Sequence, residues 1–281
     1  MERLTVLMPV CNEEEVIEDA LKSVSWASEI LVVDSGSTDK TIEICKKYTD
    51  KILYRPYTYY ADQVNWGINK ASSRWILLLD ADERVTPELE KEIKYLLQRP
   101  KSMNQYKGYQ VARRHYFLGK WLRYGGRYPL YNIRLFQKSC RFEDRLVHPH
   151  IILEKKQTGW LKNDIIHLSD RSLEQYFEKF NKYTTYEALE AYKNFQHKQK
   201  IPWKEFFTNF LVFKSVIKKF WIRLPVAPIL RFFYMYFLRL GFLDGYKGFM
   251  VAKLYAWADY VSRMKFKELL KKKNARYKSK I

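Results

Sequence analysis

The chain has 281 residues, of which 47% are hydrophobic, so it can bury a substantial core and is not a disordered protein. Its formal net charge of +20 is uneven, because residues 200–281 contain 19 Lys or Arg against 4 Asp or Glu, whereas residues 1–199 contain 32 against 27. A nearly balanced domain is therefore expected to precede a strongly basic region. The three cysteines (Cys11, Cys45 and Cys140) are too few and too scattered for a disulfide framework or a zinc site, which fits a reducing compartment.

The N-terminal residues lead directly into a strand-like segment and lack the charged and apolar regions of a signal peptide. No uncharged apolar run approaches the roughly 18 residues of a membrane-spanning helix. Together these features predict a protein on the cytoplasmic side of the membrane.

The first hundred residues alternate strand patterns with helical patterns. Strands are expected at 4–10, 30–33, 52–54 and 75–79, and helices over 12–26, 39–48, 61–71 and 87–98. Asn12 is expected to cap the first helix, with Glu15 in the capping-box position, and Thr86 to open the last. Strands that alternate with helices at this spacing predict an α/β fold with a parallel sheet.

The pattern changes after about residue 100. Strands are expected at 108–117 and 131–137 around a Gly125–Gly126 loop, with a further candidate at 146–153, and a helix from Ser172 to about Lys200. Pro202 marks a boundary. We therefore expect one domain over 1–200, with halves of about 1–100 and 101–200, and a separate basic, aromatic-rich helical region over 201–281.

The apolar strand pattern at 75–79 ends in two carboxylates one residue apart, Asp80 and Asp82. On extended backbone, residues i and i+2 face the same side, so both carboxylates can reach one ligand. Ligands collect beyond the carboxyl ends of strands in α/β sheets, and hard oxygen ligands suit Mg²⁺ or Mn²⁺. On the pair alone, a second interpretation stays open, in which Asp80 only caps the following turn.

Two other predicted strands also end in polar residues: Asn12 and Glu13 follow the first, and Asp34 follows the second. Parallel strands place these ends at one edge of the sheet, beside Asp80 and Asp82. A cleft this acidic needs a divalent cation to accept a diphosphate. For Glu14 and Glu15, complementing a helix N-terminus is the simpler role, whereas for Asp39 this role and contact with a ligand both stay open.

Three segments in this order resemble the signatures of family 2 glycosyltransferases. They are residues 6–14 (Val-Leu-Met-Pro-Val-Cys-Asn-Glu-Glu), 33–41 (Val-Asp-Ser-Gly-Ser-Thr-Asp-Lys-Thr) and 80–83 (Asp-Ala-Asp-Glu), the last similar to the family's DxD element. Residues 123–129, 134–136, 142–148 and 241–248 extend the similarity, towards the branch of lipopolysaccharide inner-core β-1,4-glucosyltransferases.

The resemblance implies a GT-A fold, with a Rossmann-like, mostly parallel sheet flanked by helices, and a nucleotide-sugar donor such as a UDP-hexose. It implies that residues 1–100 form the donor half, that Asp82 binds Mg²⁺ or Mn²⁺, and that Asp80 contacts the ribose or metal side. His148 is a candidate for a third metal ligand or for a diphosphate contact. The donor-binding residues that it implies are Pro9, Asn12, Glu13, Asp34, Ser35, Gly36, Asp80, Ala81 and Arg134.

The resemblance also implies an inverting transfer, which needs one general base in an acidic motif downstream of the DxD element. Glu143 and Asp144 are the two candidates, with Asp144 favoured by analogy, and a surface acid pair beside Arg141 and Arg145 is the alternative. His167 is a weaker candidate for the site than His148. Leu130 and Pro149 depart from the pattern of relatives on the expected acceptor side.

The region 201–281 interleaves aromatic residues with Lys and Arg, a composition that suits an anionic membrane surface. Two other interpretations stay open. One is a helical cover on the first domain. The other is nucleic-acid binding, which is the least favoured because no such motif is present. We expect an enzyme peripheral to the inner face of the cell membrane that transfers a hexose, with UDP-glucose as the favoured donor, to a lipid-linked saccharide such as the lipopolysaccharide inner core. A polyprenyl-phosphate glycosyltransferase and a non-catalytic membrane-binding protein on a degenerate GT-A scaffold are the alternatives.

Overall fold

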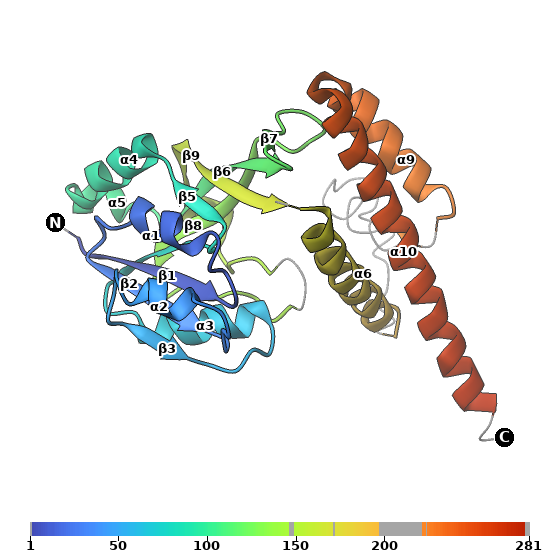
Figure 1. Cartoon of the computed structure of the whole chain (residues 1–281), viewed down its shortest axis with the longest axis horizontal. Coiled ribbons are helices and arrows are strands. Elements are labelled where there is room, and N and C mark those ends of the chain that lie inside the picture. Colours follow the sequence, from blue (N-terminus) through green and yellow to red (C-terminus); the bar gives the residue numbers. More distant parts are fainter. Residues whose placement is uncertain (1, 146–148, 171, 197–220, 223, 279–281) are drawn as a thin grey trace. The chain divides into compact units, whose positions relative to one another are not determined.

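The computed structural model describes residues 2–145, 149–170, 172–196, 221–222 and 224–278. The chain divides into two compact units (Figure 1). Unit 1 comprises Met1–Arg123 and Arg127–Arg171, and unit 2 comprises Tyr124–Gly126 and Ser172–Ile281.

Unit 1 is built on a mixed sheet of nine strands within the described residues. In order across the sheet these are β3 (Ile52–Tyr54), β2 (Glu29–Asp34), β1 (Leu4–Val10), β4 (Trp75–Leu78), β8 (Leu130–Gln137), β6 (Gly108–Phe117), β9 (Thr158–Asp170) and β5 (Glu83–Val85), with β7 (Lys120–Trp121) paired to β6. Strands β1 to β4 run parallel to one another. β8 is antiparallel to β4 and β6, and β5 is antiparallel to β9.

Helices cover both faces of this sheet (Figure 1). α1 (Ile17–Ser23) and α4 (Pro87–Leu97) pack on one face and α3 (Tyr60–Lys70) on the other. α2 (Thr41–Cys45), α5 (Pro100–Met103) and the 3₁₀ turn η1 (Lys155–Gln157) are short connectors.

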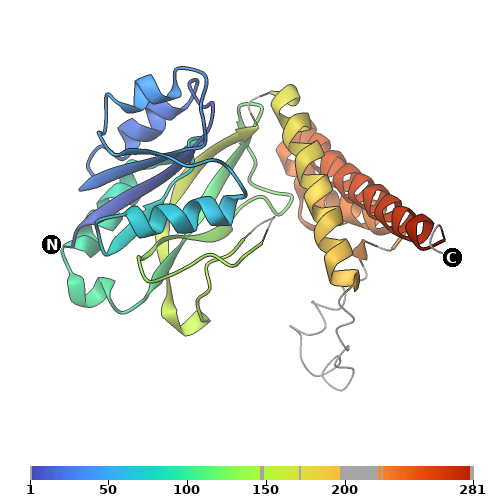
Figure 2. The ribbon, with the colours of Figure 1, turned by 90° about the horizontal axis from the view of Figure 1, so that it is seen from below.

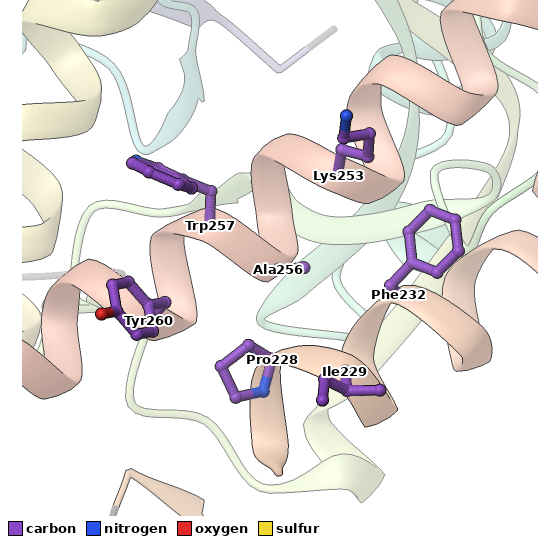
Figure 3. Close-up of a pocket in the computed structure, with 7 residues that line it drawn as sticks. All are labelled: Pro228, Ile229, Phe232, Lys253, Ala256, Trp257 and Tyr260. Atoms are coloured by element: carbon purple, nitrogen blue, oxygen red, sulfur yellow. The ribbon is translucent and has the colours of Figure 1, made fainter. Parts of the chain in front are cut away.

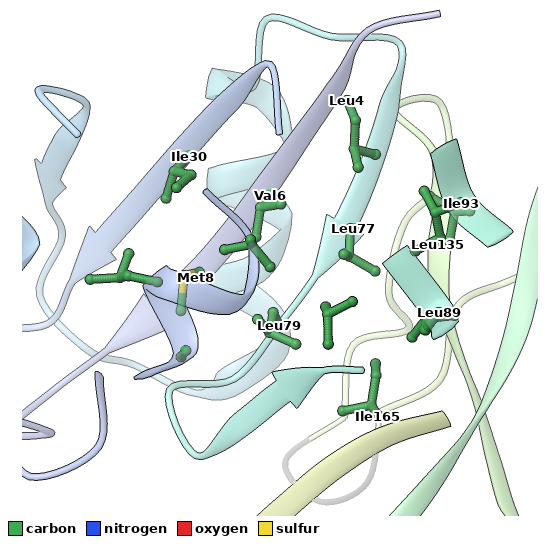
Figure 4. Close-up of a cluster of buried hydrophobic side chains, with 14 of the residues drawn as sticks. Leu4, Val6, Met8, Ile30, Leu77, Leu79, Leu89, Ile93, Leu135 and Ile165 are labelled. Carbon is green, nitrogen blue, oxygen red and sulfur yellow. The ribbon is translucent and has the colours of Figure 1, made fainter. Parts of the chain in front are cut away.

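The core has two layers because side chains alternate along each strand. In β1, Val6 and Met8 join the cluster under α1 and α4 (Figure 4), whereas Leu7 joins the cluster under α3. At Gly67 of α3 an added Cβ would lie 2.6 Å from Leu7 Cδ1, so the glycine allows α3 to approach β1 closely.

Most expected elements of unit 1 are present with shifted ends, and two expectations are wrong. The expected Rossmann-like sheet flanked by helices is present as a mixed sheet, because β8 runs antiparallel to β4 and β6, and β5 runs antiparallel to β9. The sequence does not predict β9, which is parallel to β6, because its charged stretch at 162–164 hides the strand alternation. Asn12 does not cap a helix, since it has φ 55° and α1 begins only at Ile17. The described part of 146–153 forms a single bridge, Phe142 to Ile151, and no strand.

Unit 2 is helical in the residues described. It contains α6 (Leu173–Gln196), α9 (Ala227–Phe233) continuing into the π-helical η2 (Tyr234–Leu238), the 3₁₀ turn η3 (Gly241–Asp244) and α10 (Gly245–Lys278). α6 and α9 both pack along α10 (Figure 2). An added Cβ at Gly248 would lie 2.0 Å from the Gly241 carbonyl oxygen, so only glycine permits this contact between η3 and α10.

The loop Tyr124–Gly126 belongs to unit 2 although its neighbours in sequence belong to unit 1. The Tyr124 amide donates to Asp244 Oδ2 at 2.9 Å, and the Gly125 amide donates to the Arg239 carbonyl at 2.8 Å. The buried Asp244 carboxylate therefore holds a turn of this loop rather than facing solvent.

The two compact units divide near residue 171, whereas the boundary predicted at residues 200–202 lies outside the described residues. The units divide near residue 171 because α6 packs with α10: Ser262 Oγ donates to Glu187 Oε2 at 2.8 Å, and the rings of Phe195 and Phe266 lie 6.1 Å apart. None of the described helices combines the length and the apolarity needed to cross a bilayer.

Candidate active site

The carboxyl ends of β1, β2 and β4 meet at one edge of the sheet, as the sequence predicts. Val10 of β1 pairs with Asp34 of β2, and Leu7 pairs with Leu78 of β4. Pro9, Ser35 and Ala81 lie at or just beyond these strand ends. The three acidic motifs therefore converge through the strand register alone.

The loops after β1 and β2 are hydrogen-bonded to each other. Asp34 is buried and accepts from the Gly36 amide at 3.1 Å and from the Ser37 amide and hydroxyl at 3.0 and 2.6 Å. Asn12 Oδ1 accepts from the Thr38 amide at 2.8 Å. Gly36 has φ +104°, a conformation that favours glycine. These contacts fix the backbone at the place where the nucleoside is expected.

Three further acidic residues extend this connection between the loops. The Glu13 amide donates to Thr41 Oγ1 at 2.8 Å, and the Glu14 amide donates to Asp39 Oδ2 at 3.1 Å. In return, Glu14 Oε2 accepts from the Lys40 amide at 2.9 Å. Glu14 and Asp39 therefore bind specific amides across the two loops, which is a structural role.

Asp80 lies in a buried network of charges. Its Oδ2 accepts from Arg134 Nη2 at 2.7 Å and its Oδ1 accepts from the Tyr60 hydroxyl at 2.7 Å. The same Arg134 Nη2 donates to Glu83 Oε1 at 2.6 Å, and Arg113 Nη1 lies 3.3 Å from that oxygen. Burial alone would raise the pKa of Asp80, but Arg134 and Tyr60 hold it below its ordinary value. Arg134 thus orients Asp80 and neutralises Glu83.

Asp82 faces a pair of histidines. Its Oδ1 lies 3.4 Å from His167 Nε2, and His167 Nδ1 lies 3.0 Å from His115 Nδ1. His115 is buried, and burial together with neighbouring cations, Arg127 foremost, lowers its pKa well below the ordinary value, so it stays neutral. The pairing follows from register, because β5 and β6 flank β9 and place Glu83 and His115 opposite His167.

The donor set around Asp82 fits a divalent cation. An oxygen and a nitrogen that ligate one metal at right angles, each at about 2.1 Å, lie roughly 3 Å apart, close to the separation of Asp82 Oδ1 and His167 Nε2. Within the described part of the chain, no group of three or more His, Cys, Asp or Glu side chains is close enough to hold a metal by itself. Mg²⁺ and Mn²⁺ commonly take further oxygens from a substrate phosphate or from water. His148, the expected third ligand, lies outside the described residues.

The two candidates for the general base differ in their surroundings. Glu143 Oε1 accepts from the His150 amide and from Arg145 Nη1, both at 3.2 Å, so Glu143 stabilises the loop that contains it. Asp144 is exposed, and its hydrogen bond from the Tyr59 hydroxyl raises the pKa of that tyrosine.

The N-terminus of α3 links this loop to the strand ends. Tyr59 donates to Asp144 and Tyr60 donates to Asp80, so consecutive residues hold the two carboxylates. Asn65 of the same helix bonds the Phe142 carbonyl at 3.1 Å and the Phe142 amide at 2.9 Å. α3 therefore fixes the position of the candidate base relative to the DxD element.

Four residues of this site are predicted weakly or not at all from the sequence. Glu83 ends the 80–83 motif, yet its burial against Arg134 could not be predicted without knowing that β8 pairs with β4. Tyr60 begins a helix and carries no motif. His115 and His167 lie in β6 and β9, and only the register of the missed strand brings them together.

Comparison with known proteins identifies the family to which this chain is similar. The family profile described as "Glycosyl transferase family 2" matches residues 5–154. An uncharacterized glycosyltransferase of Rickettsia typhi is 29% identical over 291 residues, which cover 98% of this chain and 90% of that protein. The lipopolysaccharide core biosynthesis glycosyltransferase LpsC of Rhizobium meliloti is 28% identical over 192 residues, covering 66% of this chain and 70% of LpsC.

Among solved structures, this chain is similar to glucosyl-3-phosphoglycerate synthase from Mycobacterium tuberculosis in complex with Mn²⁺ and uridine-diphosphate-glucose. The sequence identity is 20% and the TM-score is 0.34, over 40% of this chain and 44% of that structure.

Proposed function

The chain belongs to glycosyltransferase family 2, whose profile matches more than half of it, and from this premise we propose that it is an inverting, metal-dependent hexosyltransferase. It is a glycosyltransferase of GT-A fold. The proposed donor is a nucleoside-diphosphate hexose, with UDP-glucose the first to test. The observation that carries the proposal is the convergence of Asp34, Asp80 and Asp82 at one sheet edge, with His167 beside Asp82.

The nucleoside is proposed to lie against the interlocked loops after β1 and β2. Asn12 and Asp34 hold these loops, and Pro9, Glu13, Ser35 and Gly36 line the same strand ends. Because the loop hydrogen bonds are already made within the protein, the nucleoside meets a surface that needs no reordering, which lowers the entropic cost of binding.

Asp82 and His167 would hold Mg²⁺ or Mn²⁺, with Asp80 beside them on the ribose or metal side. When bound, such a cation offsets the negative charge that develops on the departing diphosphate. Arg134 keeps Asp80 ionised and oriented. Ala81 is buried, and its carbonyl accepts from Arg84 Nη1 at 2.9 Å, so the backbone between the two aspartates is fixed.

Asp144 is the proposed general base. It is exposed, whereas Glu143 accepts the His150 amide of its own loop. A single displacement needs one base to take the proton of the acceptor hydroxyl while the hexose is transferred with inversion. The Tyr59 hydroxyl orients the Asp144 carboxylate for this step.

The proposed acceptor is a lipid-linked saccharide such as the lipopolysaccharide inner core, at the inner face of the cell membrane. The similarity to LpsC, a lipopolysaccharide core biosynthesis enzyme, supports this class of acceptor. The excess of Lys and Arg in residues 200–281 favours an anionic membrane surface as a partner.

The test uses the purified full chain with a panel of nucleotide sugars and Mn²⁺, measuring the release of nucleoside diphosphate and the transfer to extracted lipopolysaccharide core acceptors. Asp144→Asn should abolish transfer, whereas the matched change Glu143→Gln should leave most of it. Equal activity of the two variants would reject the assignment of the base. An α-linked product from an α-linked donor would reject inversion.

A further inference from the structure

The helix α9 and its extension η2 expose an apolar stripe. Seven positions at helical spacing between residues 226 and 238 are exposed, and all seven are apolar or aromatic. We name them the α9 stripe; they are Val226, Ile229, Leu230, Phe233, Tyr234, Phe237 and Leu238. The exposed fraction is 59% at Ile229 and 75% at Leu238.

On the opposite face of this helix, its one charged residue pairs with a carboxylate of α10. Arg231 Nε donates to Asp259 Oδ2 of α10 at 3.0 Å, and the Trp221 indole donates to the same oxygen at 2.7 Å. Ala227 and Met235 are buried on this face. A surface helix in water normally turns its apolar side inward and its charges outward. In α9 the one charged residue, Arg231, pairs with Asp259 while the apolar stripe is exposed, which fits an apolar medium beside the stripe.

The apolar surface continues beyond α9. Phe242, Leu243 and Tyr246 are exposed at 43%, 51% and 74% on η3 and the start of α10. At the other end, Ile229 borders a groove between α9 and α10 that is also lined by Trp257 and Tyr260 (Figure 3). Exposed apolar side chains gathered on neighbouring elements mark an interaction site, and the exposed Trp257 and Tyr260 at the groove suit the boundary between lipid and water.

The charges near this surface are positive. The sequence has no Asp or Glu between Glu205 and Asp244. Asp244 is buried and bonded to the Tyr124 amide, while Arg239 and Lys253 are exposed. Lys253 also lines the groove. Cations around an apolar surface complement a membrane with anionic headgroups.

We propose that the α9 stripe inserts into the interface of a bilayer that contains anionic phospholipids, with Arg239 and Lys253 among the headgroup phosphates. This deepens the membrane location in the proposed function and rests on it. It differs from attachment by the basic C-terminus alone, because inserted apolar side chains keep the protein bound at high salt, whereas exposed charges are screened.

The test measures cosedimentation of the full chain with vesicles of phosphatidylcholine and of phosphatidylcholine with phosphatidylglycerol. It is done at about 0.1 M and about 1 M NaCl, where the screening length falls from about 10 Å to about 3 Å. The key variant is Phe233→Ser/Phe237→Ser, which removes two stacked, exposed rings. The matched control is Tyr95→Ser/Trp160→Ser, which removes two equally exposed aromatic residues of unit 1.

The wild-type protein should bind the anionic vesicles and keep part of this binding at high salt. Phe233→Ser/Phe237→Ser should lower the partition coefficient at least about tenfold, as expected for two partly inserted rings, while the control binds like the wild type. Unchanged binding of the key variant would overturn the proposal. So would light scattering that shows a wild-type dimer and a monomeric key variant, because the stripe would then be an interface between two copies.

Hydrolysis of UDP-glucose with Mn²⁺ is measured on the same samples. It should be equal in wild type, control and key variant, since the stripe lies in unit 2 and the nucleotide-sugar residues in unit 1. Absence of hydrolysis in all samples would count against the proposed function. The vesicle experiment would still decide whether the α9 stripe inserts into the bilayer.

Discussion

The two ends of the sheet in unit 1 each hold a carboxylate that is mostly shielded from solvent, and the two carboxylates have different partners. At the amino ends, Glu29 of β2 is enclosed by hydrogen bonds from Thr5, Lys51 and Ser72. At the carboxyl ends, Asp82 follows β4 and faces the imidazole of His167. The first carboxylate joins the starts of β1, β2 and β4 to one another, whereas the second meets a group that can share a metal ion.

Low exposure alone therefore does not separate a structural carboxylate from a functional one. The chemistry of the partners does: hydroxyls, an amide and an ammonium group satisfy Glu29, while a carboxylate beside an imidazole is a pair that can bind a metal ion. If this comparison is right, substitutions at the two ends should change different measured quantities.

The largest effect is expected for Asp82→Asn. It should lower the rate of hexose transfer about a thousandfold, roughly 4 kcal/mol, because the substitution removes a charged ligand of the cation that stabilises the leaving group. The midpoint of denaturant unfolding should stay close to that of the wild type. Asp50→Asn, an exposed carboxylate far from any motif, is the matched control and should change neither quantity.

Arg134→Met should have the next largest effect, and on stability. The variant leaves the buried Glu83 and the partly buried Asp80 without their shared guanidinium, which is expected to cost about 3 kcal/mol of unfolding free energy. Urea denaturation measures this loss. A loss below about 1 kcal/mol would mean that the network is not a stabilising one.

Glu29→Gln should lower the unfolding free energy at pH 7 by about 2 kcal/mol and leave transfer at low temperature unchanged. Burial alone would raise the pKa of Glu29, but Lys51, Thr5 and Ser72 lower it from 4.5 to about 2. Its contribution is therefore complete above pH 4.5 and is lost as the pH falls towards 2. Denaturation of both proteins across this range should show the difference shrinking; a constant difference would contradict the pairing.

The smallest effect is expected at His115, which does not touch the expected cation and acts as a positioning residue for His167. His115→Phe keeps a ring and removes the hydrogen bond, and it should weaken Mn²⁺ binding about tenfold. His115→Gln can keep a hydrogen bond and should restore part of the affinity. Calorimetric titration with Mn²⁺ distinguishes this role from simple packing, for which both variants should bind Mn²⁺ like the wild type.

The sequence predicts one side of the site better than the other. Strands β1, β2 and β4 are short, apolar and parallel, so their ends and the residues that follow can be aligned from the pattern alone. Asp34, Asp80 and Asp82 were found in this way. Asn12 was placed correctly at a strand end but wrongly as a helix cap, because its partner Thr38 lies in another loop.

The other side depends on strands that pair over long sequence distances. β9 lies beside β6 and β5, and its polar residues do not alternate clearly, so neither the strand nor His167 opposite His115 could be derived from local patterns. The outward apolar face of α9 was likewise hidden in a region where almost every residue is apolar, aromatic or basic. There the direction of each side chain depends on the packing against α10.

The most direct test of the account is a Mn²⁺ titration in the presence of UDP, followed by the electron paramagnetic resonance signal of free Mn²⁺. The wild type should take up one Mn²⁺, and both Asp82→Asn and His167→Asn should weaken this binding at least about tenfold, while Glu29→Gln binds like the wild type. Wild-type affinity in both Asp82→Asn and His167→Asn would contradict the claim that the carboxyl end of the sheet holds the metal.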